Sequence, residues 1–162
     1  MKPLCYDYLN CPTTFSTYDD FNKKFRITRP ESFNFAYDVA DRIAQEEPDR
    51  LAVLWTDETG ACIHYTFGQL KEESDRAANL FKSLGIRKGD KVMLVLRRHY
   101  TFWIAIMALC RIGAVAVPAT HLLTKKDIVY RGNAAQVCAV VCVNDPFVIE
   151  LSLIHISEPT RR

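Results

Sequence analysis

The sequence contains none of the short motifs that commonly bind nucleotide phosphates or identify common hydrolases. Its six glycines never cluster, and neither Gly-x-x-x-x-Gly-Lys-Ser/Thr nor Gly-x-Gly-x-x-Gly occurs in the 162 residues. Gly-x-Ser-x-Gly and His-Glu-x-x-His are also missing, so serine hydrolase and zinc protease chemistry has no support. We therefore assign no complete nucleotide site and no catalytic residue from motifs alone.

Charge of one sign and long apolar runs are scarce as well. Lys and Arg number 21 against 19 Asp and Glu, and no run of basic residues exceeds two. This balance excludes nucleic acid and anionic membrane surfaces as expected partners. The longest apolar run, Phe102 to Cys110, has about half the length of a membrane span. Extending it to residue 119 would bury Arg111 in the bilayer, so no membrane span is expected.

Paired cysteines are missing too. The six cysteines form no Cys-x-x-Cys pair and have no histidine at zinc-finger spacing, so neither a metal site nor a disulfide framework is expected. Cys138 and Cys142 are expected to share a strand face as buried, inert residues. The first ten residues carry Asp7 and Asn10 where a secretory signal has its apolar core, which favours a cytoplasmic chain.

What the sequence does contain is a soluble, globular composition with alternating helical and strand patterns. Hydrophobic residues make up 49% and charged residues 25%. Residues 1–32, with three prolines, are expected to form an irregular N-terminal extension around a body at 33–150. Within that body the apolar periodicity predicts helices at 34–46, 67–84, 100–112 and 124–134, a hairpin of strands 51–55 and 62–66, and further strands at 91–96, 114–117 and 138–143.

The alternation predicts an α/β fold with a doubly wound, mostly parallel sheet. The run KVMLVL at 91–96 is almost continuously apolar, which is typical of a parallel strand covered on both faces. Thr66 with Gln69, and Thr124 with Asp127, have the spacing of capping boxes that begin helices. Ligands of such folds usually bind beyond the carboxyl ends of the strands.

Two segments at these strand ends are candidate binding residues. Arg97, Arg98 and His99 directly follow the apolar strand, and an arginine side chain binds phosphate or carboxylate through paired donors. The alternative, which we favour, is a solvated loop that leads the chain back to water. Thr120 and His121 occupy the corresponding position after the next strand, where the histidine is either a hydrogen-bonding loop residue or a ligand contact.

The last twelve residues, LSLIHISEPTRR, have neither a helical nor a strand period. Residues 151–162 resemble the translation of a transposase-type sequencing adapter, so we expect an artefactual tail in which His155 and Ser157 carry no function. The alternative is a natural disordered tail. We prefer the interpretation that the sequence is a gene fragment whose reading frame continues into the adapter.

Three blocks of the body carry a resemblance to a known family. They are FNFAYDVADRIA (33–44), YTFGQLKEESDRAANLFKSLGIRKGDKVMLVL (65–96) and WIAIMALCRIGAVAVPATHLLTKKDIVYR (103–131). In this order they resemble the N-terminal part of the adenylate-forming, AMP-binding acyl-CoA synthetases, most closely the medium-chain branch. The third block, with Gly-Ala-Val-x-x-Pro followed by Leu-Thr-x-x-Asp-Ile, is the most specific.

The resemblance implies an acid–thiol ligase, of medium-chain or acetate-like type, that activates a carboxylic acid with ATP and Mg²⁺, forms an acyl-adenylate, and transfers the acyl group to coenzyme A. The family's phosphate loop, its adenylate and metal motif and its catalytic lysine lie downstream of the matching blocks. We therefore expect a truncated fragment of the fold that is inactive alone and binds none of these cofactors fully, with no catalytic and no metal-binding residue. The alternatives are a non-catalytic α/β binding or regulatory module and another adenylate-forming ligase.

The resemblance transfers one residue role. In the medium-chain branch, the polar residue of the loop before Leu-Thr-x-x-Asp-Ile contacts coenzyme A, and the matching residue here is His121. The branch often has glutamine at this position, and both side chains can donate a hydrogen bond. Arg97 and Arg98 stand where relatives commonly carry a Pro-Asn pair, so no role is transferred to them.

Overall fold

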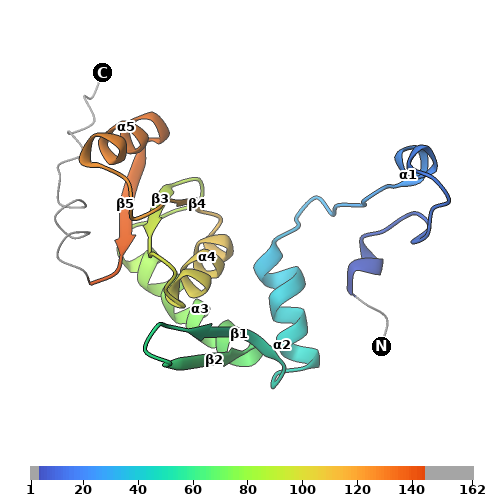
Figure 1. Ribbon diagram of the computed structural model, residues 1–162, viewed down its shortest axis with the longest axis horizontal. Coiled ribbons are helices and arrows are strands. Elements are labelled where there is room, and N and C mark those ends of the chain that lie inside the picture. The colour runs from blue at the N-terminus through green and yellow to red at the C-terminus, as the bar shows by residue number, and fades with distance from the viewer. Residues whose placement is uncertain (1–3, 145–162) are drawn as a thin grey trace.

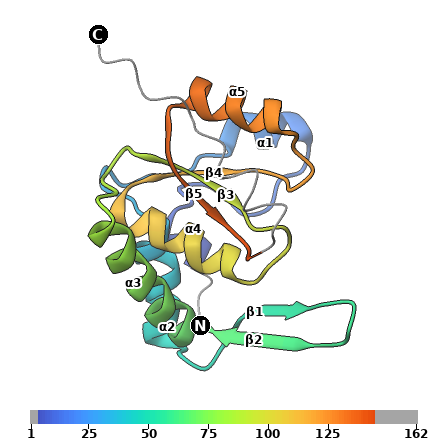
Figure 2. The same ribbon diagram turned by 90° about the vertical axis from the view of Figure 1, so that its left-hand side faces the viewer.

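A three-stranded parallel sheet forms the centre of the molecule. The computed structural model describes residues 4–144. Strand β3 (Lys91–Val95) lies between β4 (Val115–Pro118) and β5 (Val137–Cys142), so the strand order is β4-β3-β5 (Figure 1). Helix α4 (Thr101–Ile112) connects β3 to β4, and α5 (Lys125–Ala135) connects β4 to β5. The two crossover helices cover opposite faces (Figure 2), which confirms the expected doubly wound α/β fold.

Strand β3 supplies both halves of the core because its side chains alternate between the two faces. Val92 and Leu94 pack against α4 and against α3 (Phe67–Ser83), where Phe81 and Leu109 are among the buried partners. On the opposite face the buried cluster is Met93, Val95, Leu123, Ile128 and Val137, and α5 covers it. The continuous apolar run in the sequence is therefore explained by burial on both sides.

Local signals begin and end the helices as the sequence predicts. Thr66 and Gln69 form a complete capping box at the start of α3, with the Gln69 N–H donating to the Thr66 hydroxyl at 3.2 Å. Thr124 and Asp127 form a second box at the start of α5. Gly113 ends α4 with a left-handed φ of +70°, a conformation that glycine adopts without strain.

A separate antiparallel hairpin lies beside the helices. Strands β1 (Leu51–Thr56) and β2 (Cys62–Thr66) pair as the sequence predicts. The Asp57 carboxylate accepts hydrogen bonds from the backbone N–H groups of Thr59 and Ala61 at 2.9 and 3.0 Å, and these bonds fix the connecting turn. A hydrogen bond from the Thr59 hydroxyl is the largest cause that lowers the pKa of Asp57, and these backbone hydrogen bonds lower it further.

The first helix of the body differs from its prediction in its winding. Residues Ala36–Asp41 form a π-helix, η2, and only Arg42–Glu46 are α-helical, as α2. Ala36 and Ala40 of η2 and Ala44 of α2 are buried, and their spacing of four residues places them on one face of the helix. Asp41, at the end of η2, is buried as well.

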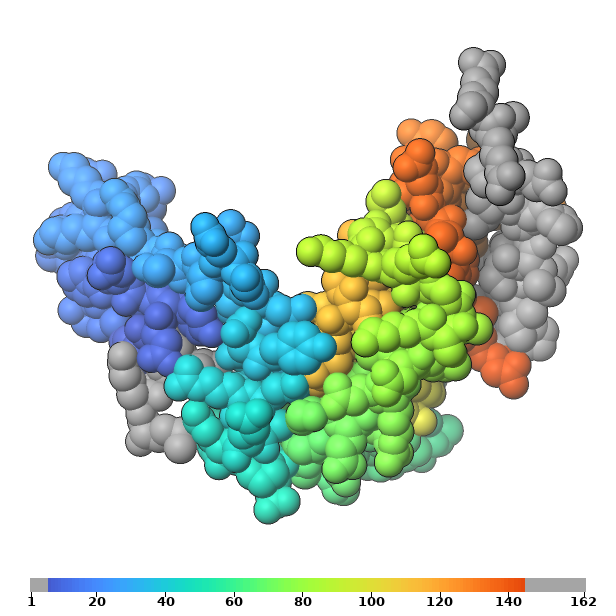
Figure 3. All heavy atoms as spheres, turned by 180° about the vertical axis from the view of Figure 1, so that it is seen from behind, coloured from blue at the N-terminus to red at the C-terminus, as the bar shows by residue number. Residues whose placement is uncertain are grey.

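The N-terminal extension is more ordered than expected. Within it, η1 (Leu4–Asp7) is a 3-10 turn and α1 (Tyr18–Lys24) is a helix capped by Thr17, and Leu9 and Ile27 form an antiparallel bridge. The extension contacts the body through an Asp7–Arg42 ion pair of 2.6 Å, a hydrogen bond of 3.3 Å from the Tyr8 hydroxyl to the Asp38 carbonyl, and the Tyr8 and Phe33 rings, whose centres are 5.4 Å apart. Figure 3 shows a concave surface between these N-terminal residues and the sheet.

Two further expectations end differently. Cys138 is exposed and Cys142 only partly buried, so the prediction that both are buried is wrong. The pairing of β3 with β5 shifts register between Lys91 and Val92, and Cys138 is the bulged residue that the shift leaves outside the core. Desolvation raises the pKa of its thiol. The predicted tail, 151–162, lies outside the described residues, and among residues 4–144 no helix is long and apolar enough to cross a membrane.

Candidate functional site

The carboxyl edge of the parallel sheet brings both sequence-predicted loops together. Leu94 of β3 pairs with Pro118 of β4. Arg97 comes three residues after Leu94 and His121 three residues after Pro118, so both residues follow the carboxyl ends of neighbouring strands. In the order β4-β3-β5, β4 is added on one side of β3 and β5 on the other side. Doubly wound proteins bind ligands at such a point, where the strand order reverses. The edge is therefore the candidate site.

The loop after β3 is held in place by the hairpin. Trp55 of β1 donates its indole N–H to the Arg98 carbonyl at 2.6 Å. Its ring lies 5.7 Å from His99 and 5.5 Å from Tyr100, and Tyr65 of β2 lies 5.8 Å from Tyr100. Burial is the main cause that raises the pKa of the Tyr65 hydroxyl, and the electrostatic effect of Tyr100 raises it further.

The three polar residues of this loop have different roles. His99 caps the start of α4. Its Nδ1 lies 2.9 Å from the Thr101 hydroxyl and accepts a hydrogen bond from the Thr101 backbone N–H at 3.4 Å. Arg97 has a left-handed φ of +52°, which is uncommon for a residue with a side chain. Arg98 is exposed and forms no ion pair within the described part of the chain.

His121 lies in the loop between β4 and the capping box of α5. Its side chain is partly buried, and among residues 4–144 its ring makes no hydrogen bond or ion pair. Pro118 and Ala119, just before it, line a cavity of about 340 Å³ between β4 and α5. The imidazole is thus available to a ligand at the edge, while its neighbour Thr120 accepts the Leu122 N–H at 3.3 Å.

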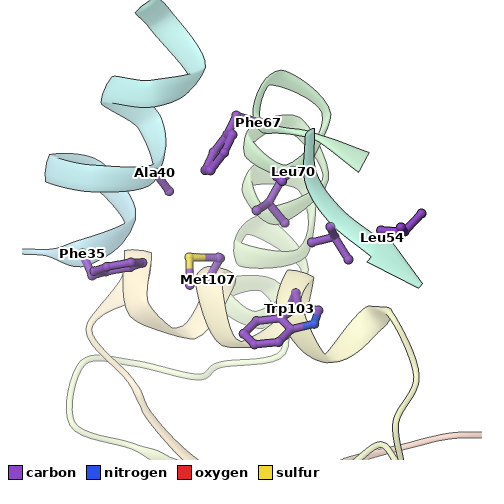
Figure 4. Close-up of a pocket in the computed structure, with 9 residues that line it drawn as sticks. Phe35, Ala40, Leu54, Phe67, Leu70, Trp103 and Met107 are labelled. Atoms are coloured by element: carbon purple, nitrogen blue, oxygen red, sulfur yellow. The ribbon is translucent and has the colours of Figure 1, made fainter. Parts of the chain in front are cut away.

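Sequence reasoning missed an apolar cavity of about 310 Å³ between η2, β1, α3 and α4 (Figure 4). Nine residues line this cavity, and all nine are apolar. Phe35, Leu70, Trp103 and Met107 are among them. Phe35 and Trp103 are 48% and 50% exposed. No signal in the sequence indicates this cavity, because its walls come from four separate elements.

Sequence reasoning also missed a buried ion pair. Arg111 of α4 donates to both carboxylate oxygens of Asp41 at 2.7 and 2.5 Å, to the Ser74 hydroxyl at 3.0 Å, and lies 3.2 Å from Asp75. Its guanidinium carbon is 5.3 Å from the ring centre of Tyr37. Desolvation lowers the pKa of Arg111, but the bonds and charge of Asp41 raise it overall. The ion pair therefore joins η2, α3 and α4.

Comparison with known proteins agrees with this architecture. A model of the AMP-binding enzyme family matches residues 40–160. The chain belongs to this family. Human acyl-coenzyme A synthetase ACSM3, a mitochondrial protein, is 33% identical over 136 residues, which are 80% of this chain and 23% of the relative. Rat ACSM5, also mitochondrial, is 39% identical over 118 residues, 69% of this chain and 20% of the relative.

A solved structure gives the same result for the fold. The benzoate CoA ligase of Burkholderia xenovorans superposes with a TM-score of 0.64 and 28% identity over 75% of this chain and 24% of that enzyme. The chain therefore spans about a quarter of the length of these AMP-binding relatives. Among residues 4–144, no three His, Cys, Asp or Glu side chains gather in a group that could hold a metal ion.

Proposed function

We propose that this AMP-binding chain is part of an ATP-dependent acyl-CoA synthetase for medium-chain carboxylic acids. The reaction joins the acid to ATP as an acyl-adenylate with release of pyrophosphate, and the acyl group then moves to coenzyme A with release of AMP. The observation that carries the proposal is the 33–39% identity to ACSM3 and ACSM5, over most of this chain.

In this proposal the chain supplies scaffold and one cofactor contact. Because the family's phosphate loop, metal motif and catalytic lysine lie downstream of the matching blocks, we assign the described residues no step with Mg²⁺ and no catalysis. His121 fits a coenzyme A contact because its partly buried ring has no partner among the described residues and follows a cavity wall at the carboxyl edge. By itself the 162-residue chain is proposed to be inactive.

The test begins with the complete reading frame. Long-read sequencing of the source DNA across the codon for Glu150 shows whether the frame continues into a Ser/Thr/Gly-rich phosphate loop or ends after residue 162. The expressed product of a continuing frame should form octanoyl-CoA and AMP from octanoate, ATP and CoA. A genomic stop after residue 162, with no acid-dependent ATP–pyrophosphate exchange, contradicts the enzyme and favours a binding module. The family match extends to residue 160, and the adapter origin of 151–162 stays a prediction.

The role of His121 is tested in that complete enzyme. His121→Ala should raise the KM for CoA several-fold with little change in kcat or in the KM for ATP, because one ligand hydrogen bond is lost. His121→Gln should restore the KM, since the amide also donates. His64→Ala, at an exposed position of β2, is the matched control. Equal KM values in the two alanine variants contradict the contact.

A cytoplasmic location is also a proposal. The curated relatives ACSM3 and ACSM5 are named as mitochondrial proteins. Fluorescence of the complete protein with a C-terminal tag should fill the cytoplasm, and accumulation in mitochondria contradicts the proposal.

A further inference from the structure

The side chain of His99 joins a helix, a loop and the hairpin. The residue precedes the first turn of α4, where its carbonyl accepts the Phe102 N–H at 3.1 Å. Its Nδ1 accepts the Thr101 backbone N–H at 3.4 Å and lies 2.9 Å from the Thr101 hydroxyl. The partly buried ring has its centre 4.1 Å from that of Tyr100 and 5.7 Å from that of Trp55. A change in this one ring therefore reaches three elements.

The hydrogen bond to Thr101 requires a neutral imidazole. A backbone N–H can only donate, so the Nδ1 that receives it must carry a lone pair, and the ring proton is then on Nε2. Protonation makes both ring nitrogens donors, so that Nδ1–H faces the Thr101 N–H. The bond is then lost, and the Thr101 N–H at the start of α4 loses this acceptor.

The charges around the ring act in the same direction. The first turn of α4 carries the positive end of the helix dipole, which disfavours a further positive charge there. Arg97 and Arg98 place two guanidinium groups in the same loop. Among residues 4–144 no carboxylate forms a hydrogen bond or an ion pair with the His99 ring. A positive charge on the ring thus has no paired counter-charge in this part of the chain.

The hairpin and α3 contribute rings and one more distant charge. The ring of Trp55 packs on His99, and Tyr65 of β2 packs on Tyr100. The nearest carboxylate on this side is Glu73 of α3, whose charge acts on Tyr65. Aromatic faces attract a cation, but this attraction does not depend on the direction in which Nδ1 points. The ring contacts therefore do not preserve the bond to the helix.

The ring also lies beside the hydrogen bond that anchors the loop. Trp55 donates its indole N–H to the Arg98 carbonyl at 2.6 Å, and Arg98 directly precedes His99. Because Trp55 contacts the ring as well, a movement of His99 changes both ends of this anchor. Loss of the cap is thereby transmitted to the loop at the carboxyl edge of the sheet.

We propose that His99 is a pH-sensitive switch of the loop 97–100. Its neutral imidazole holds the loop to the start of α4, and protonation releases the loop. Imidazole groups change charge between about pH 5 and 8, so the loop is held at the upper end of this range and released at the lower end. The switch does not rest on the proposed function, because it concerns hydrogen bonds within the described residues alone.

The experiment is backbone amide hydrogen exchange of the 162-residue chain at about pH 8 and about pH 5.5. Protection factors, which correct for the intrinsic effect of pH on exchange, measure the loop in each state. Those of the amides at 97–101 should be about fivefold lower at the acidic pH, as expected for one lost hydrogen bond. Those of β3 should be equal at both pH values, and circular dichroism shows that the chain stays folded.

Two substitutions of His99 separate the acceptor from the charge. The amide oxygen of His99→Asn accepts the Thr101 N–H at every pH, so this variant should keep high protection under both conditions. His99→Ala has no acceptor and should show low protection under both. His64→Asn is the matched control, because His64 is an exposed histidine of the hairpin. It should keep the pH dependence of the wild-type chain.

Three results overturn the proposal. The first is equal protection of the wild-type loop at the two pH values, a comparison that needs no variant. The second is a pH dependence that persists in His99→Asn, which assigns the effect to another titrating group. The third is an equal loss of protection in β3 at the acidic pH, which shows a general destabilisation by acid instead of a local release of the loop.

Discussion

Arg111 and Asp41, which are seventy positions apart in the sequence, form a bidentate ion pair with N–O distances of 2.7 and 2.5 Å. The side chains are 2% and 9% exposed. Because the pair lies between three helices, it determines how the π-helical segment sits on α3 and α4.

Arg111→Ala should destabilise the protein by about 3–5 kcal/mol, because the Asp41 carboxylate is then buried without a partner. The free energy of unfolding in urea measures the effect. Arg76→Ala removes an exposed ion pair with Glu73 and should cost less than about 1 kcal/mol. If both variants lose similar stability, the buried pair does not have the structural role described above.

Gly113→Ala should destabilise the end of α4 by about 1–2 kcal/mol, since the left-handed φ of +70° is unfavourable for a residue with a Cβ. A Cβ at this position also meets the Lys88 side chain at 3.0 Å. Gly85→Ala is the control, with a φ of +85° and open space around the new Cβ. Its loss in melting temperature measures the backbone effect alone, and a larger loss than in Gly113→Ala contradicts the steric contribution.

The capping box of α5 should be visible in a carboxylate titration. The Thr124 hydroxyl, and then the Thr124 backbone N–H, lower the pKa of Asp127. A lowered pKa means that this stabilisation is fully present above the unfolded value of about 3.9 and is lost as the pH falls through the folded value. Thr124→Val should raise the Asp127 pKa in an NMR titration, whereas Thr120→Val should leave it unchanged. An unchanged pKa in the Thr124 variant speaks against the box.

Trp55→Phe should loosen the loop 97–100 by removing the indole donor to the Arg98 carbonyl. One lost hydrogen bond corresponds to about 1 kcal/mol. Hydrogen exchange of the loop amides should accelerate about fivefold, and those of β3 should stay protected. Trp103→Phe, in α4, is the matched change that leaves this bond intact. Equal acceleration in both variants indicates a general loss of stability instead.

The apolar cavity predicts self-association at high concentration. Leu54 and Trp103, at its rim, are 62% and 50% exposed, and exposed apolar patches promote aggregation. Leu54→Lys should reduce the apparent mass in light scattering without lowering the melting temperature. Glu58→Lys, in the hairpin turn, controls for the change of charge. A monodisperse wild-type monomer contradicts this prediction.

The sequence predicts those features that neighbouring residues determine. Thr66 with Gln69 lies in one turn, so the capping box is readable from four residues. The Arg111–Asp41 pair and the Trp55–Arg98 bond join residues seventy and forty-three positions apart, and no local pattern encodes them. The bulge at Cys138 depends on the register of a partner strand, so alternation within its own strand gives the wrong burial.

The candidate site shows the same division. Placement of Arg98 and His121 at the carboxyl edge follows from strand alternation, which the sequence carries. The rings that surround the first loop come from the hairpin, which is a separate sheet, and their convergence needs tertiary contacts.

The strand order has a consequence for synthesis on the ribosome. Strand β3 ends at Val95, but its second partner is complete only at Cys142, forty-seven residues later. At roughly 5–20 residues per second, the nascent chain carries an unfinished sheet for about 2–10 seconds. Helix α3 is already made when β3 emerges, so Val92 and Leu94 can be covered early, whereas Met93 and Val95 wait for α5. This second face is the one that a chaperone on the translating ribosome would meet.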